Sequence, residues 1–193
     1  MKQIVKLTIW TISLLFVGTA MAASTGWNVG ASVGSSSINL SDADCAGTTK
    51  CDKSDTGFKV SGGYTFMPNF GVELAYIDLG KATLSDGTIT ASLSETGLAA
   101  YGVGTYPIDN FSLFAKAGIS SLKSKIDAAI GGFSASDSST NTNFAWGIGA
   151  GYTISKNVSA MLEWERYKGD FSDISSDLTY DVDLISIGMK YNF

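Results

Sequence analysis

The chain has 193 residues, 45% of them hydrophobic, and a formal net charge of −5 at pH 7. This length suits a single domain. An acidic chain lacks the basic surface that nucleic-acid phosphates require, so no nucleic acid is expected as a partner. After Val17 no run of about 18 apolar residues occurs, which excludes a helical membrane protein.

The N-terminal segment has the three parts of a secretory signal peptide. Lys2 and Lys6 make its start positive, Ile9–Val17 is a short apolar core, and Ala20–Met21–Ala22 is a cleavage site of small residues. We therefore expect residues 1–22 to be removed. The mature chain, from Ala23, then has 11 basic and 18 acidic residues and a net charge of −7.

Apolar residues alternate with polar or small residues in eight segments of the mature chain. This period of two is typical of a strand whose two faces meet different surroundings. In chain order the segments are WNVGASVG (27–34), FKVSGGYTF (58–66), FGVELAY (70–76), TGLAAYGVGTY (96–106), FSLFAKAGISS (111–121), FAWGIGAGY (144–152), VSAMLEW (158–164) and LISIGMKYNF (184–193). The fourth is ambiguous in phase, and we expect Tyr101 and Val103 to share the outward apolar face.

The connections between these segments differ in length. Three are short, around Pro68, Pro107 and Lys156, and four are long: Ser35–Thr56, Leu79–Ser94, Leu122–Thr142 and Lys168–Leu178. Short turns at one end and long loops at the other, with an even number of strands, are the organisation of an outer-membrane barrel. Each segment is long enough for a tilted crossing, which takes roughly 9 to 11 residues. We predict an all-β fold, an eight-stranded antiparallel transmembrane up-and-down β-barrel over residues 23–193.

A soluble sandwich or barrel is the alternative for any single alternating segment. Aromatic residues at the segment ends favour the membrane barrel, because they match its interfacial girdles. On the face of the strands opposite to the apolar residues, charged residues of both signs occur. They suit a narrow polar lumen better than the dry core of a soluble protein. These candidate lumen residues are Lys59, Glu73, Lys116, Glu163, Glu165 and Lys190.

Three stretches resemble a known family: GFKVSGGYTFMPNFGVELAYIDLG (57–80), GVGTYPIDNFSLFAKAGIS (102–120) and DVDLISIGMKYNF (181–193). They are similar to the OmpA-type eight-stranded outer-membrane β-barrels, in the compact form without the periplasmic peptidoglycan-binding domain. The resemblance implies a monomer in the bacterial outer membrane, in contact with its lipid and lipopolysaccharide. It also implies that Tyr191 and Phe193 are the C-terminal signal for the outer-membrane assembly machinery.

For function, the resemblance implies a structural or weak porin-like role, with a lumen plugged or gated by salt bridges. Lys116 with Glu73 or Glu163 is the candidate gate; pairing that only satisfies the interior is the alternative. A second possibility is a surface adhesin that binds through its long loops. An enzyme is the least favoured hypothesis, because barrel enzymes of similar fold use histidine and this chain has none. We expect no cofactor and no catalytic residue.

Two further features concern the connections. Cys45 and Cys51 lie close together in a polar stretch, and an exported chain favours a disulfide between them over a metal site. Aspartates gather in the first and last long loops, where they could hold divalent cations or simply form a solvated rim. They are Asp42, Asp44, Asp52, Asp55, Asp170, Asp173, Asp177, Asp181 and Asp183.

Overall fold

The computed structural model describes residues 25–39, 50–52, 54–85, 89–130, 133–170 and 179–193. Within these ranges the chain forms eight long strands and one short strand. They are β1 (Gly26–Ile38), β2 (Lys50–Asp52), β3 (Ser54–Met67), β4 (Phe70–Ser85), β5 (Ile89–Ile108), β6 (Phe111–Ile130), β7 (Phe133–Thr153), β8 (Val158–Asp170) and β9 (Thr179–Asn192). The described ranges contain no helix that is long and apolar enough to span a membrane. The predicted signal peptide and Cys45 lie outside them, so the disulfide stays a prediction.

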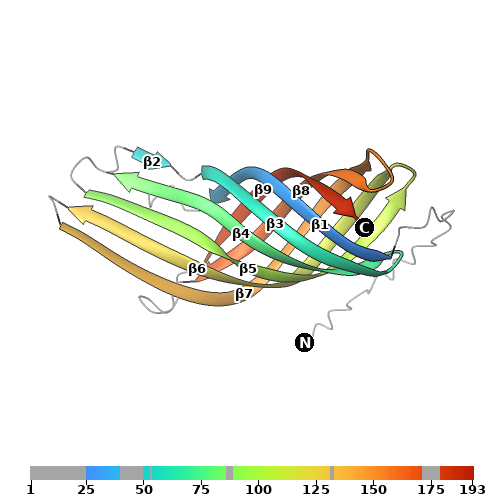
Figure 1. Ribbon diagram of the computed structural model, residues 1–193. Coiled ribbons are helices and arrows are strands. Elements are labelled where there is room, and N and C mark those ends of the chain that lie inside the picture. The colour runs from blue at the N-terminus through green and yellow to red at the C-terminus, as the bar shows by residue number, and fades with distance from the viewer. Residues whose placement is uncertain (1–24, 40–49, 53, 86–88, 131–132, 171–178) are drawn as a thin grey trace, which may run out of the picture.

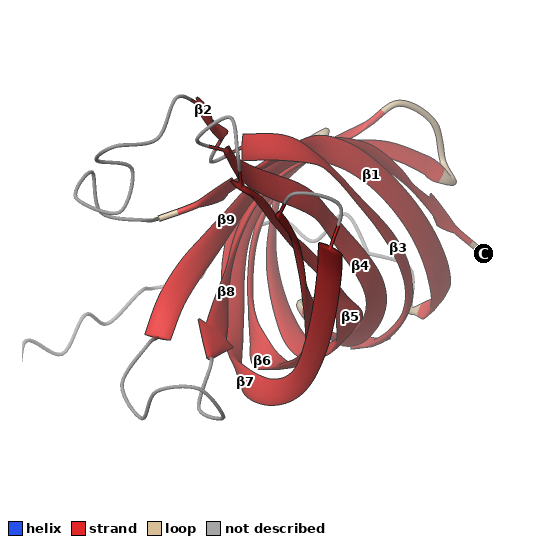
Figure 2. Ribbon diagram, turned by 90° about the vertical axis from the view of Figure 1, so that its left-hand side faces the viewer, coloured by secondary structure: helices blue, strands red, loops and turns tan. Residues whose placement is uncertain are grey.

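The eight long strands close into a barrel. Neighbouring strands pair antiparallel, and β1 pairs with β9, so the first and last strands complete the ring that Figure 2 shows. The short β2 adds to the edge of β4, where Lys50 lies opposite Ser85. The predicted fold class is confirmed. Closure leaves no sheet edge within the ring, as a barrel in hydrocarbon requires.

The two ends of the barrel differ. Three tight connections, at 68–69, 109–110 and 154–157, lie at one end together with the C-terminus; we call this the turn end. In the turn between β5 and β6, Asp109 has a φ of 52°, a left-handed conformation that aspartate tolerates better than most residues. The opposite end, which carries the other four connections, is the loop end.

Two of the predicted long loops are wrong. β4 continues to Ser85 and β5 begins at Ile89, while β6 continues to Ile130 and β7 begins at Phe133. β5, β6 and β7 therefore have 20, 20 and 21 residues, compared with 13 in β1 and in β8. Figure 1 shows these long strands and β4 projecting beyond β1 and β3 at the loop end. Serine and threonine are the most frequent residues of the projecting parts. This composition is typical of loops, so the sequence predicted loops where the structure has ordinary strand pairing.

The outer face of the barrel is apolar, as the alternation predicted. Trp27, Leu74 and Ile187 are 67%, 67% and 64% exposed. The phase assigned to the fourth segment is the exception. Tyr101 is buried and Val103 packs against the buried cluster inside the barrel, so Tyr101 and Val103 face the lumen and not the lipid. Leu98, of the opposite parity, is exposed on the outer face.

Aromatic side chains of the outer face form two bands. Toward the turn end, ring centroids are 5.1 Å apart in Trp27–Tyr64, 4.9 Å in Phe111–Tyr152 and 5.0 Å in Tyr191–Phe193. Toward the loop end, they are 6.1 Å apart in Phe58–Tyr76 and 4.9 Å in Trp146–Trp164. Two aromatic girdles around an apolar belt are the mark of a membrane barrel.

The lumen is filled by side chains in three layers along the barrel axis. Near the loop end the layer is apolar, the middle layer is charged, and near the turn end Asn28, Phe114 and Met161 are buried. The apolar layer contains Ile38, Ile77, Leu79, Leu122 and Val182. An eight-stranded barrel is just wide enough for this kind of filling.

Candidate functional site

Five charged side chains meet in the middle of the lumen, which we call the central ion cluster: Lys59, Glu73, Lys116, Glu163 and Glu165. Each occupies an inward position on β3, β4, β6 or β8, and each is at most 6% exposed. Neighbouring glycines leave room for them, because Gly63 lies opposite Glu73 and Gly147 lies opposite both Lys116 and Glu165. Five of the six lumen residues expected from the sequence are therefore brought together.

Each lysine of the central ion cluster contacts all three glutamates. The Lys116 Nζ lies 3.1 Å from Glu73 Oε1, 2.7 Å from Glu163 Oε2 and 2.8 Å from Glu165 Oε1. The Lys59 Nζ lies 3.9 Å from Glu73 and 2.8 Å from Glu165, and it also donates to Glu163. Both partners proposed for Lys116 are thus in contact with it, and the charges of the cluster form one shared network.

Lys190, the sixth candidate, faces the lumen but stands apart from the cluster. Its ammonium lies 5.7 Å from the centroid of the Phe114 ring, toward the turn end. Lys190, Lys59 and Glu163 all line one cavity of about 10 Å³, enough for roughly one water molecule.

Glu95 is a buried lumen carboxyl that the sequence analysis missed. It is 2% exposed and lies beyond the central ion cluster toward the loop end, next to the apolar layer. The hydroxyls of Tyr180 and Ser124 both donate to its Oε1, while Oε2 has no hydrogen-bond partner among the described residues. The outer face at this level is polar, with Ser94 and Thr96 beside it on β5, so Glu95 lies outside the apolar belt. Burial raises the pKa of Glu95, and the two hydrogen bonds oppose that rise.

Arg166 holds two of the aspartates that the sequence placed near the last long loop. Its guanidinium makes two hydrogen bonds of 2.7 Å to the Asp183 carboxylate, and Nη1 lies 3.6 Å from Asp181. These hydrogen bonds lower the pKa of Asp183. The pair ties β8 to β9 on the outer face beside Trp164, whose ring centroid lies 5.3 Å from the guanidinium carbon. Asp42, Asp44, Asp173 and Asp177 lie outside the described residues, and no metal-binding group of three ligands occurs within them.

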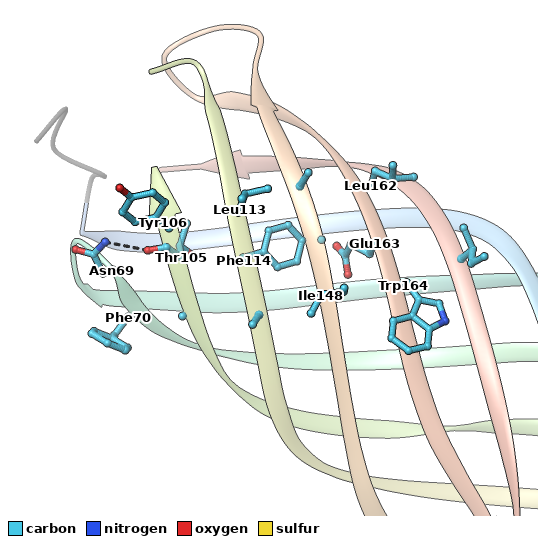
Figure 3. Close-up of a pocket in the computed structure, with 15 residues that line it drawn as sticks. Asn69, Phe70, Thr105, Tyr106, Leu113, Phe114, Ile148, Leu162, Glu163 and Trp164 are labelled. Carbon is cyan, nitrogen blue, oxygen red and sulfur yellow. Dashed lines mark hydrogen bonds between the residues drawn. The ribbon is translucent and has the colours of Figure 1, made fainter. Parts of the chain in front are cut away.

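A wide hollow opens on the outer wall of the barrel, and its lining also reaches the inward-facing Phe114 and Glu163. It is a groove of about 1010 Å³ whose walls include Leu113, Leu162 and Ile185, all more than half exposed. Figure 3 shows Phe70 and Asn69 at one end, where Asn69 donates a 2.9 Å hydrogen bond to the Thr105 carbonyl. The groove lies within the apolar belt and offers few polar groups. The buried charged groups of the lumen therefore remain the candidate functional site.

The sequence matches the family model described as an outer membrane protein beta-barrel domain over residues 9–193. The chain belongs to this family. Together with the closed barrel and its girdles, this places the protein in the bacterial outer membrane, with the loop end facing outside the cell. No curated protein matches the sequence.

Solved structures support the same fold at low sequence identity. Ail, the attachment invasion locus protein of Yersinia pestis, has a TM-score of 0.60 at 18% identity, covering 88% of this chain and 100% of Ail. Neisserial surface protein A has a TM-score of 0.59 at 16% identity, covering 88% and 98% of the two chains. The N-terminal barrel domain of Pseudomonas aeruginosa OprF has a TM-score of 0.53 at 13% identity, covering 88% and 100%. At such identities the likeness establishes the fold alone.

Proposed function

We propose that this protein is a non-enzymatic envelope barrel whose lumen is a normally closed, weakly conducting pore, with the central ion cluster as its gate. The observation that carries this proposal is the sharing of Lys59 and Lys116 among three glutamates across the middle of the lumen. A passing ion has to displace these contacts. In this proposal the closed barrel also stiffens the membrane around it.

The energetics of buried ion pairs favour a closed state that a small change can open. Removing one partner of a buried pair costs about 3–5 kcal/mol, because the remaining charge is left without compensation. Lys116 contacts all three glutamates, so its loss leaves them with Lys59 alone. The formal charge of the cluster, with two lysines and three glutamates, then changes from −1 to −2. The added negative charge repels itself, draws in water and attracts cations.

The test is single-channel conductance of the refolded mature chain in a planar bilayer. We expect Lys116→Ala to raise the conductance and to shift selectivity toward cations, with a loss of stability of about 3 kcal/mol in denaturant unfolding. Lys156→Ala, in an exposed turn, is the control and should change neither property. Heat-dependent gel mobility and a β-type circular dichroism spectrum establish folding in each case.

Exchanging the charges of Lys116 and Glu163 distinguishes a gate made of ion pairs from a lumen that any substitution would disrupt. Lys116→Glu alone places a fourth carboxylate in the cluster, whereas Lys116→Glu combined with Glu163→Lys restores one contact between opposite charges. We expect the double variant to return toward the low conductance of the parent chain. An unchanged conductance in folded Lys116→Ala, or an equal conductance in the single and double exchange variants, would contradict a gate at this position.

A second candidate function is surface binding at the loop end. The projecting parts of the hairpins β4–β5 and β6–β7 extend past the aromatic girdle as paired strands, with exposed lysines at Lys81, Lys123 and Lys125. Ail, of similar fold, is named an attachment invasion locus protein. Binding of the purified barrel to host-cell surfaces, lost when the tip of the β6–β7 hairpin is removed, would support an adhesin role.

The absence of histidine from the whole sequence supports the non-enzymatic part of the proposal, since a serine or aspartate nucleophile would lack its usual base. We further propose the partners that such a barrel implies: outer-membrane lipid, lipopolysaccharide and the assembly machinery, with the barrel acting as a monomer. Turnover in lipase or lipid A deacylase assays would contradict the non-enzymatic role.

A further inference from the structure

Glu95 differs from every carboxylate of the central ion cluster in its surroundings. Glu73, Glu163 and Glu165 each form an ion pair with a lysine, whereas the hydrogen bonds of Glu95 within the described residues come only from hydroxyl groups. Its Oε2 is buried and has no hydrogen-bond partner there. An ionised carboxylate in such a place carries a large desolvation cost, so an ionisable side chain is kept here at the expense of stability.

The apolar layer forms a constriction around Glu95. A cavity of about 10 Å³ beside it is lined by the apolar side chains of Ile38, Leu79, Leu93 and Val182, with Ala82, and by the polar side chains of Ser36, Asp55, Lys81 and Glu95 itself. The space holds roughly one water molecule, and most of its side chains offer water no hydrogen bond. This is the setting in which a narrow pore closes by excluding water, and in which one added charge restores wetting.

Other titratable groups near Glu95 have partners or reach solvent. Asp55 of β3 and Lys81 of β4 line the same cavity, but both are exposed, and the Asp55 carboxylate accepts hydrogen bonds from the backbone N–H groups of Thr56 and Lys81. From β9, Tyr180 contributes its hydroxyl, and from β6 Ser124 does the same. Lys123 and Lys125 of β6 point to the opposite, outer face. No described cation therefore compensates Glu95.

We propose that Glu95 is a proton-binding site that opens and closes a second constriction of the lumen, at the loop end, in series with the central ion cluster. This inference rests on the proposed pore function. When Glu95 holds its proton, the layer of apolar side chains is neutral and dry, and the lumen is closed at the loop end. When the carboxyl releases its proton to external water, the carboxylate must be hydrated, so water and cations enter the constriction.

The two constrictions then respond to different conditions. In the central ion cluster opposite charges compensate each other, and the closed state depends on their contact. At Glu95 a single group changes its charge with the pH outside the cell. The lumen should therefore conduct better at alkaline than at acidic external pH, and the external solution should decide this, because Glu95 lies on the loop-end side of the cluster.

The experiment measures conductance with the loop-end solution at about pH 5 and about pH 9, which bracket a carboxyl whose pKa is raised by burial. We expect the unsubstituted barrel to conduct more at the higher pH. Glu95→Gln keeps the shape and cannot ionise, so it should remain at the acidic conductance at both values. Asp127→Asn, which removes an exposed carboxylate from β6, is the matched control and should keep the full pH response.

Tyr180→Phe supplies a second, graded variant. It removes a hydrogen bond that favours the ionised form of Glu95, so the midpoint of the conductance change should move to higher pH. Difference infrared spectra provide a readout that does not need conduction. The carbonyl band of a protonated carboxylic acid should disappear on raising the pH, and this change should be missing from Glu95→Gln.

The outcomes separate this inference from the proposed function. All conductances are measured with Lys116 present and again in the Lys116→Ala background. A pH response that is lost in Glu95→Gln supports the proton site even if Lys116→Ala has no effect, in which case only the central gate is wrong. Two outcomes would contradict the proposal that Glu95 controls the entry of water into the loop-end constriction. One is a pH response that persists in Glu95→Gln, and the other is the absence of conductance at any pH in either background.

Discussion

Gly118 lies on β6 at a point where the neighbouring strand leaves no room for a side chain. A Cβ at this position would lie 1.9 Å from the carbonyl oxygen of Ala100 on β5, and a backbone atom cannot turn away as a side chain can. Two residues before it on the same inward face stands Lys116. The glycine thus lets β5 and β6 approach closely beside the central ion cluster.

We expect Gly118→Ala to destabilise the barrel by about 1–3 kcal/mol, the usual range for overpacking a filled interior. The matched control is Gly62→Ala, on the outer face of β3, where an added Cβ would meet nothing within 4 Å. The control should change stability by no more than about 0.5 kcal/mol. Unfolding by denaturant in detergent micelles measures both, and equal values for the two variants would contradict this account of the β5–β6 contact.

Single residues also mark where sequence reasoning succeeded and where it failed. Lys59, Glu73, Lys116, Glu163 and Glu165 were found because each interrupts a clear apolar alternation with a charge on the opposite parity. Tyr101 and Val103 were assigned to the wrong face because the fourth segment is apolar on both parities, and bulky Tyr101 resembles a girdle aromatic. Once that phase was wrong, Glu95 could not be recognised as a lumen residue.

At the scale of strands, the alternation of apolar and polar residues predicts the part of a strand that crosses the membrane. It does not predict how far the strand continues beyond the membrane. Residues 120–127 on β6 pair with β7 as regularly as the membrane segment does, yet their outer face carries Lys123 and Lys125 and their inner face mixes serine with Leu122 and Ile126. Because the outer face is polar here and the inner face mixes serine with apolar residues, the strong hydrophobic period of the membrane segment is lost while cross-strand pairing continues. This is why the eight strands were predicted and their lengths were not.

The projecting part of the β6–β7 hairpin should be dispensable for folding. Its strands pair with each other in register from Ile126 opposite Asp137 to Ile130 opposite Phe133, beyond the aromatic girdle. We expect a chain in which residues 127–136 are replaced by an Asn-Gly turn to keep the heat-dependent gel mobility of the folded barrel, because Asn-Gly suits a two-residue hairpin. Conductance should also be retained, since the central ion cluster is untouched.

An equivalent replacement inside the apolar belt serves as the comparison. Removing two residues from β6 between Leu113 and Ile119 shortens the strand within the membrane and puts the rest of β6 out of register with β5 and β7, so this chain should not fold. If the hairpin variant also failed to fold, the projecting sheet would be needed for assembly. The division of the barrel into an essential belt and an optional extension would then be wrong.

At the scale of the whole molecule, closure of the barrel depends on contact between the two ends of the chain. β1 begins at Gly26 and β9 ends at Asn192, so the last pairing to form joins residues separated by nearly the full mature length. Loop closure over such a separation is slow, because the chain must lose its freedom before the contacts form. An open barrel meanwhile exposes the edges of β1 and β9, which makes the final strand the point at which assistance matters most.

Phe193 lies where this closure is completed. Its backbone N–H donates a 3.0 Å hydrogen bond to the Trp27 carbonyl, its ring centroid lies 5.0 Å from that of Tyr191, and its side chain is 68% exposed on the outer face. The ring therefore adds little to packing within the barrel. We propose that this exposed aromatic residue of the closing strand acts as the signal for the assembly machinery that the family resemblance implies.

We expect Phe193→Ala to lower the amount of folded barrel in the outer membrane of cells while the purified chain still refolds in detergent with unchanged heat-dependent mobility. Ile187→Ala is the matched control, because Ile187 is a similarly exposed apolar residue of the same strand, at 64%, but lies six positions from the end. The control should reach the outer membrane at the parent level. If Phe193→Ala reduced refolding in detergent as much as assembly in cells, its ring would serve the stability of the barrel and not recognition; if both variants assembled normally, the C-terminal aromatic would carry no signal in this chain.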